Sequence, residues 1–191
     1  MHHHYLLHKP SGYVSQFITN ELKRVKRKKF LGELFDFRDG TMAVGRLDLQ
    51  SEGLLLLTTD GKVSAAVRSK AVEKEYLAQV HGEITEQAAI ELSKGVEIRI
   101  NGEAYQTQEC STEVCTPPNY IGPNPRGERH PKHGPTSWVK ITISEGKFRQ
   151  VRKMTAAVGH PTLRLIRIRV GKEKLEGIEP GKVKEVEAFQ L

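Results

Sequence analysis

The chain has 191 residues, of which 37% are hydrophobic and 28% are charged. This length and balance exclude a fibrous or disordered chain and allow one generous core or two small lobes. Thirty Lys and Arg residues against 23 Asp and Glu give a formal net charge of +7, an excess that favours a polyanionic partner such as nucleic acid. The 2 cysteines are too few for a disulfide-stapled secreted domain, and no apolar run approaches a membrane span, so we expect a cytoplasmic protein.

The N-terminal region predicts a short strand followed by a basic segment. Residues 2–4 are histidines, either native or the remnant of a tag, and we expect them to be exposed. Residues 5–12 predict a strand that is stopped by Pro10 and turned by Gly12. A loop or helix follows to about residue 40. Within it, the basic run 23–29 is either a solvated helix face or an arm that contacts phosphates.

The most informative stretch is residues 45–61, where a carboxylate precedes a run of leucines. Leucines at positions 54–57 are bounded by glycines and show no alternation, which is typical of a strand covered on both faces. Asp48 would lie on the loop leading into this strand, where Arg46 can keep a partly buried carboxylate ionised. An ionised, positioned aspartate is a candidate nucleophile. The alternative is a turn residue that bonds its own backbone.

The middle of the chain predicts two helices and a strand. Asp60 can cap a short helix, and Thr85 can cap a second one that ends near Gly95. The run 75–81 between them, which includes Tyr76, has the composition of a strand, and strands resume from about residue 96. The first helix would carry Val63, Ala66 and Val67, and the residues expected to point inward in the second are Ala88, Ala89 and Leu92.

Residues 116–135 are too rich in proline and glycine for regular structure, so we expect an exposed insertion loop or a segment that orders on binding. Cys110, Cys115, His130 and His133 could form a zinc site, but their spacing fits no compact finger. The sequence also lacks the P-loop and dinucleotide fingerprints, which argues against an enzyme driven by ATP or NAD.

The C-terminal third predicts a strand from Ser137, a turn at Gly146, a helix up to Gly159 and a further strand. Phe148, Val151, Met154 and Val158 recur at helical spacing and predict the buried face of that helix. In the last strand, arginines alternate with apolar residues and would line one face, either as a groove that tracks phosphates or as plain surface solvation. The basic residues of this region are Lys147, Arg149, Arg152, Lys153, Arg164, Arg167, Arg169 and Lys172.

Three motifs stand in a characteristic order: Gly45-Arg46-Leu47-Asp48 with Ser51-Glu52-Gly53-Leu54-Leu55 and Thr58-Thr59-Asp60-Gly61, then Lys74-Glu75-Tyr76, then Glu145-Gly146-Lys147-Phe148-Arg149-Gln150-Val151-Arg152-Lys153-Met154. Together they closely resemble the RsuA-type family of ribosomal RNA pseudouridine synthases. The resemblance covers nearly the whole chain and looks nearest to members that act on the large ribosomal subunit.

This resemblance implies an α+β fold, with a long mixed and mainly antiparallel sheet that is bent around a central catalytic cleft and flanked by helices. The first family strand would start at Tyr5 and leave no room for the S4-type RNA-binding domain that many members carry. We therefore expect a single catalytic domain over residues 1–191 that recognises RNA by itself. His8 departs from the family, which often has Asn before Lys-Pro.

The resemblance also implies site roles. Asp48 would be the essential catalytic carboxylate, provisionally the nucleophile, and Arg152 the arginine that pairs with it. Arg46 would occupy the space left by the extruded nucleotide, or else contact a backbone phosphate. Tyr76 would stack on the target uracil, and Val151 would supply an apolar wall. The expected phosphate contacts are Lys147, Arg149, Arg164 and Arg167.

The implied reaction converts uridine to pseudouridine in ribosomal RNA, with the 23S RNA of the large subunit as the expected partner. Because the isomerisation conserves every atom, we expect no cofactor and no metal. Separately, we expect a monomer. Two other interpretations stay open. One is a two-carboxylate hydrolase that uses Asp48 and Glu52, and the other is a basic ribosome-binding module in which Asp48 and Arg46 form a structural ion pair.

Overall fold

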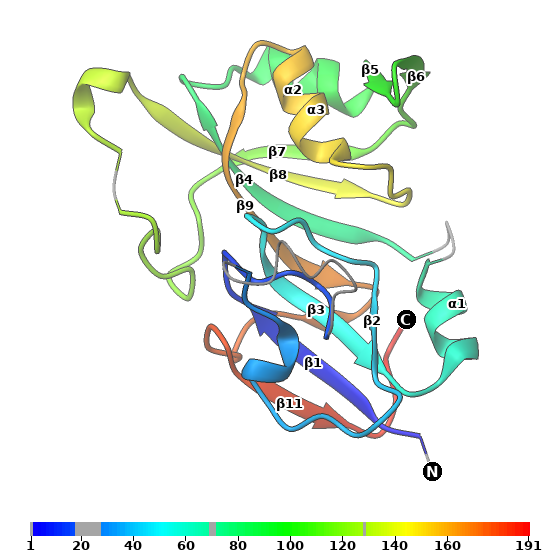
Figure 1. The fold of residues 1–191 in the computed structure, drawn as a ribbon. Helices are drawn as coiled ribbons and strands as arrows, with labels where there is room; N and C mark the ends of the chain where they lie inside the picture. Colours follow the sequence, from blue (N-terminus) through cyan, green and yellow to red (C-terminus); the bar gives the residue numbers. More distant parts are fainter. Residues whose placement is uncertain (1, 18–27, 69–71, 128) are drawn as a thin grey trace. The chain divides into compact units, whose positions relative to one another are not determined.

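The structure, a computed structural model, describes residues 2–17, 28–68, 72–127 and 129–191 (Figure 1). The chain divides into two compact units, Met1–Val72 with Arg167–Leu191 and Glu73–Ile166. Most of the basic run 23–29 lies outside the described residues. No helix in the described ranges is long and apolar enough to cross a membrane.

The first unit is built on the strands β1 (His4–Lys9), β2 (Met42–Val44) and β3 (Glu52–Thr58), with the helix α1 (Gly61–Arg68) and the short strands β10 (Glu173–Lys174) and β11 (Val183–Val186). Its strand order is β11-β1-β3-β9, and β2 pairs with β3. Strand β9 (Thr162–Val170) contributes its last four residues, 167–170, to this unit. Between β1 and β2, the described residues include a short 3-10 turn, η2 (Leu31–Glu33).

Strand β3 forms the centre of this unit. Leu54, Leu55, Leu56 and Leu57 are all 0% exposed, and every residue of β3 is buried. Antiparallel β1 pairs with β3 from His4 opposite Thr58 to Lys9 opposite Gly53. The predicted central strand is therefore confirmed, because a strand buried on both faces needs no polar alternation.

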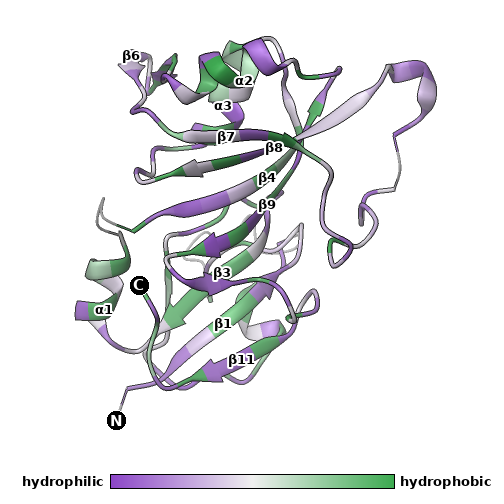
Figure 2. Cartoon of the chain, turned by 180° about the vertical axis from the view of Figure 1, so that it is seen from behind, coloured by the Kyte–Doolittle hydropathy of each residue, from purple (hydrophilic) through white to green (hydrophobic). Residues whose placement is uncertain are grey.

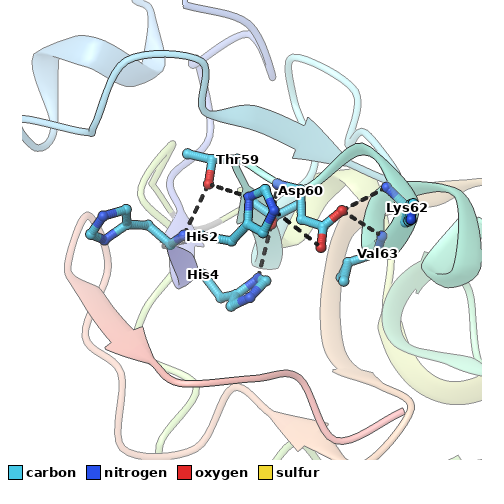
Figure 3. Close-up of polar contacts among 8 residues, drawn as sticks. His2, His4, Thr59, Asp60, Lys62 and Val63 are labelled. Atoms are coloured by element: carbon cyan, nitrogen blue, oxygen red, sulfur yellow. Dashed lines mark hydrogen bonds and ion pairs between the residues drawn. The ribbon is translucent and has the colours of Figure 1, made fainter.

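The N-terminal histidines correct the expectation that all of them would be exposed. His4 is only 7% exposed, and its Nδ1 lies 2.9 Å from Oγ1 of Thr58, while His2 stays outside with its Nε2 3.9 Å from Asp60 (Figure 3). Asp60 accepts hydrogen bonds from the backbone N–H groups of Lys62 at 2.8 Å and Val63 at 3.4 Å. These bonds confirm the predicted cap of α1, and the first of them is the main cause that lowers the pKa of Asp60.

The second unit holds β4 (Lys74–His81), β7 (Ser111–Cys115) and β8 (Thr136–Ile143), in the order β9-β4-β8-β7 with the first part of β9. A separate hairpin pairs β5 (Glu97–Ile100) with β6 (Glu103–Gln106). Helix α2 (Glu86–Ser93) begins where predicted, because Thr85 accepts a hydrogen bond from the N–H of Ala88. Ala88, Ala89 and Leu92 are buried, which confirms the predicted inward face.

Helices α2 and α3 (Gln150–Ala157) share one core with strands β4 and β8 (Figures 1 and 2). Ala78 of β4 and Ile141 of β8 meet Met154 of α3 in this cluster, and all three are 0% exposed. Phe148, in contrast, is 64% exposed and precedes α3, so its predicted place on the buried helix face is wrong. The helix begins two residues later than the apolar spacing suggests.

Between β7 and β8 the chain leaves the strands in a long excursion, drawn in yellow-green in Figure 1. Its described residues form turns and bends, and one short 3-10 turn, η3 (Pro131–His133), precedes β8. The prediction of no long regular element over 116–135 is confirmed for these residues, since proline removes backbone donors throughout the segment.

Strand β9 does not show the predicted alternation between exposed arginines and buried apolar residues. Burial is continuous from Arg164 to Ile168, and Arg164 and Arg167 are 6% and 2% exposed. The expected open arginine face is therefore wrong over this stretch. Arg169, which is half-buried, donates to the carbonyl oxygen of Gly171 at 2.8 Å.

We predict that Gly53→Ala destabilises the protein far more than Gly12→Ala. Gly53 has φ +102°, and a Cβ there would lie 2.2 Å from the carbonyl oxygen of Arg167. Backbone strain and overpacking together should cost roughly 2–6 kcal/mol of unfolding free energy. Gly12 also has a positive φ, +88°, but a Cβ there would meet nothing within 4 Å, so its variant should lose only about 1 kcal/mol. Urea denaturation of both variants measures the difference, and equal losses would contradict the close-approach explanation.

Candidate active site

Asp48 lies on a short turn that leads from the end of β2 to the start of β3. It is half-buried, and its carbonyl oxygen accepts a hydrogen bond from the N–H of Ser51 at 3.0 Å. On its N-terminal side, Ser15 Oγ donates to the carbonyl of Leu47 at 2.8 Å and accepts from the Leu47 N–H at 3.0 Å. Ser15 is buried and was not singled out by the sequence, because a lone serine carries no pattern that points to a partner 32 positions away.

Lys9 supports the other side of the Asp48 turn. Its side chain is 0% exposed, and its Nζ donates to the carbonyl oxygens of Pro10 at 2.9 Å and Leu49 at 3.4 Å. Burial lowers the pKa of Lys9 to about 8, while the charges of Glu52 and Asp48 act in the opposite direction. The turn therefore holds a buried lysine whose pKa responds to the charge of Asp48, although the sequence indicated Lys9 only as the end of a strand.

Arg167 is buried beside the Asp48 turn and bonds the main chain. Its Nε donates to the carbonyl oxygen of Leu54 at 2.7 Å, and its Nη1 donates to that of Gly45, also at 2.7 Å. With a side chain that is 2% exposed, it bonds the main chain on both sides of the Asp48 turn. Its burial does not fit the expected contact with phosphate on an open face. A buried guanidinium needs acceptors, and backbone carbonyls supply them for Nε and Nη1, whereas buried Nη2 has no hydrogen-bond partner among the described residues.

Arg46 lies two residues before Asp48 and is exposed. Exposure is compatible with the expected insertion into RNA. Glu52, the second carboxylate of the hydrolase interpretation, is 4% exposed and begins strand β3. That interpretation required a helical loop between Asp48 and Glu52. The residues between them form a turn, so the helical spacing that would pair the two carboxylates is not present.

The second unit presents the exposed residues Lys147, Phe148 and Arg149 directly before α3. Arg149 has φ 52° and ψ 34°, a left-handed conformation that is uncommon for a residue with a side chain. The N–H of Lys147 donates to Oε1 of Gln150 at 2.9 Å, and Lys147 Nζ lies 4.7 Å from the ring centroid of Tyr105. This turn therefore holds two predicted phosphate-binding side chains in a fixed, exposed conformation.

Buried Glu145 anchors that turn from below. It is 3% exposed and accepts hydrogen bonds from the Tyr105 hydroxyl, from Nε2 of Gln150 and, at 2.9 Å, from the N–H of Gln108. The bond to Glu145 is the main cause that raises the pKa of Tyr105. The sequence did not indicate this network, because its members come from two separate segments, 105–108 and 145–150, and no spacing rule connects them.

Tyr76 and Val151 meet the same apolar cluster of the second unit. Val151 is 4% exposed within it, and half-buried Tyr76 packs against it. Arg152, on the same helix as Val151, is half-buried, and its Nη1 donates to the carbonyl oxygen of Thr162 at 3.4 Å. Arg164 is buried and donates through Nη1 to the carbonyl oxygen of Gly122 at 2.9 Å. As with Arg167, its burial does not fit a contact with phosphate on an open face.

The structure thus gathers Asp48, Lys9 and Arg167 in the first unit, and Tyr76, Val151 and Arg152 in the second. The pairing of Asp48 with Arg152 joins the two units and stays a prediction. Within the described residues, no group of three or more His, Cys, Asp or Glu side chains is placed to hold a metal ion.

Comparison with known proteins identifies relatives over nearly the full length. A family model described as RNA pseudouridylate synthase matches residues 3–157. Ribosomal large subunit pseudouridine synthase E of Vibrio parahaemolyticus is 38% identical over 185 residues, which make up 95% of this chain and 73% of that protein. The protein of the same name from Xanthomonas campestris pv. campestris is 36% identical over 178 residues, 92% of this chain and 91% of that protein.

Solved structures agree. The alignment with the crystal structure of a pseudouridylate synthase covers 97% of this chain and 70% of that chain, with 27% identity and a TM-score of 0.76. A chain of a Cbf5-Nop10-Gar1 complex has a similar fold. The alignment covers 88% of this chain and 49% of that chain, at 18% identity and a TM-score of 0.56. These similarities confirm the expected α+β class with a mainly antiparallel sheet.

We predict that the pH dependence of stability reveals buried Lys9. The pKa of Lys9 is about 8 in the folded protein, against 10.5 as its ordinary value, so the folded state binds fewer protons between these pH values. Unfolding free energy relative to Lys9→Met should therefore rise between pH 8 and 10.5, by up to about 1.4 kcal/mol per pH unit, and stay flat below pH 7. Urea denaturation at several pH values measures this difference. Lys62→Met, at an exposed lysine, is the control and should follow the wild type throughout.

We predict that Arg167→Gln lowers stability by about 3–6 kcal/mol, because two buried hydrogen bonds from a charged group are lost. Arg46→Gln, at an exposed arginine, should change stability by less than about 0.5 kcal/mol. Denaturant unfolding gives both values. A stable Arg167→Gln protein with weakened RNA binding would contradict the structural role and restore the predicted phosphate contact.

Proposed function

Because the chain belongs to the RNA pseudouridylate synthase family, it is an RNA pseudouridine synthase, an isomerase, and we propose that it acts on one uridine of the large-subunit 23S ribosomal RNA. The names of its relatives from Vibrio and Xanthomonas support this substrate, as does the formal charge of +7. The family match spans residues of both compact units, which supports treating them as one catalytic domain.

Asp48 is the proposed catalytic carboxylate. The observation that carries this assignment is the turn itself, where Ser15 fixes the backbone of Leu47 and Lys9 holds the carbonyl of Leu49. A carboxylate between two anchored residues pays little entropy to reach a reactive position. Arg167 then ties this turn to β3 through Leu54, so the carboxylate is presented by a rigid part of the unit.

The reaction breaks the bond between the uracil and its ribose, rotates the freed base and rejoins it through a ring carbon. Every atom is conserved, so no donor has to be supplied. The chain must extrude the base, start the cleavage and keep water from the freed uracil. Asp48 starts the cleavage, Arg46 takes the place of the extruded nucleotide, and Tyr76 stacks on the uracil.

The second unit supplies the remaining parts. Arg152 orients the carboxylate of Asp48, and buried Val151 supports the apolar wall on which Tyr76 packs. Lys147 and Arg149, both exposed on the turn before α3, contact RNA phosphates, and Phe148 between them offers a ring for an unstacked base. We propose that the protein works in the cytoplasm. We propose a monomer, because the exposed large apolar side chains of the described residues come from separate segments.

We predict that Asp48→Asn reduces pseudouridine formation at least about a thousandfold and leaves RNA affinity within about twofold. The purified chain is incubated with unmodified 23S RNA without cofactor, and pseudouridine is mapped by chemical labelling and primer extension. Asp60→Asn is the matched control, because the amide oxygen can still cap α1 and Asp60 lies outside the proposed site.

Other outcomes would overturn the assignment in distinct ways. Product formed by Asp48→Asn would reject Asp48 as the catalyst. Binding without any product from the wild type would favour the basic binding module. RNA cleavage that depends on added metal ions would favour the hydrolase.

A further inference from the structure

The excursion between β7 and β8 encloses a hollow in the second unit. Its volume is about 690 Å³, and its polar lining is formed by Gln79, Asn124, Arg126, Arg129, Trp138 and Arg164. Gln79 of β4 and Trp138 of β8 are direct partners in the sheet register. Because side chains alternate along a strand, Gln79 lies on the opposite face of β4 from Tyr76, so this hollow is separate from the proposed base-stacking residue.

The lining residues that the structure describes carry one sign of charge. Three arginines are among them, and none of these described residues is Asp or Glu. Gln79 and Asn124 add amides that can donate and accept, and half-buried Trp138 adds an aromatic ring. Cations, amides and a tryptophan are together the side chains that bind phosphates and unpaired bases.

The arginines are held in place by backbone carbonyls. Arg126 Nη2 donates to Leu163 at 2.7 Å, and Arg164 Nη1 donates to Gly122 at 2.9 Å. Arg129 Nη2 donates to His133 at 2.5 Å. A guanidinium has five N–H donors, so exposed Arg126, held through its Nη2, still presents donors to a phosphate, with less side-chain entropy to lose.

We propose that this pocket binds an unpaired segment of the substrate RNA outside the uridine that reacts. This inference depends on the proposed function, since it takes ribosomal RNA as the substrate. The volume lies within the range of roughly 300–1,000 Å³ that is usual for ligand sites. The proline-rich excursion then acts as a substrate-recognition element and contributes to affinity without taking part in the chemistry.

Trp138 gives a direct test, because the sequence contains a single tryptophan. The emission of Asp48→Asn protein is followed during titration with a single-stranded oligonucleotide from 23S RNA, with the same sequence as a duplex, and with inorganic phosphate. We expect quenching by the single strand at the midpoint found by fluorescence anisotropy of labelled RNA. Unchanged emission at full RNA binding would overturn the proposal. Quenching that the duplex matches, or that phosphate alone reproduces, would overturn it as well.

A second test separates recognition from chemistry. Arg126→Gln should raise KM for the RNA roughly tenfold with kcat unchanged, and Arg126→Lys should recover part of the loss. Lys132→Gln removes the same charge from the same excursion outside the lining, and should change KM less than twofold. Equal effects of Arg126→Gln and Lys132→Gln, or no effect of either, would overturn the pocket. If the wild type forms no pseudouridine, the proposed function fails, whereas the emission of Trp138 still decides whether the pocket binds RNA.

Discussion

The first unit depends on one buried cation and one missing side chain. Gly53 has no Cβ, which allows the backbone of Arg167 to approach closely. A Cβ on residue 53 would lie 2.2 Å from the carbonyl oxygen of Arg167. At this position the Arg167 side chain reaches the carbonyl oxygens of Leu54 and Gly45. These two acceptors enclose the turn that carries Asp48. This contact between strands thus helps to fix the loop that carries the proposed catalyst Asp48, through two charge-assisted hydrogen bonds.

The positive charge of the chain therefore serves two purposes. Lys9, Arg164 and Arg167 are buried and donate to backbone carbonyls, so they stabilise loops. Lys147 and Arg149 are exposed, and they are the proposed contacts to RNA phosphates. Salt screens exposed charges strongly and buried ones weakly. The salt dependence of RNA binding should consequently report the exposed cations only. It does not count the buried cations that the fold requires.

Sequence patterns were sufficient where the physical cause is local. The uniform leucine run predicted buried β3, and the side chains of Asp60 and Thr85 predicted two helix caps, because each depends on neighbours within a few residues. They failed for Arg167, whose acceptors lie 113 and 122 positions away, since a charged residue in an alternating pattern looks exposed unless its distant partners are known. The prediction for Phe148 was wrong for a related reason. Phe148 fits the helical spacing, but it precedes the helix, which begins only after left-handed Arg149.

Both units present their functional loops in the same physical way. The turn of Asp48 is held by Ser15 and Lys9, and the turn before α3 is held by buried Glu145 through its acceptor bonds. In each case the polar groups that fix the loop are shielded from water, so their hydrogen bonds are stronger and their loss is costly. A reaction that breaks and remakes a bond to the same base must keep that base from diffusing or reacting with water. Loops anchored by buried hydrogen bonds suit this requirement, because the proposed catalytic carboxylate and the proposed phosphate contacts then have little conformational freedom left to lose.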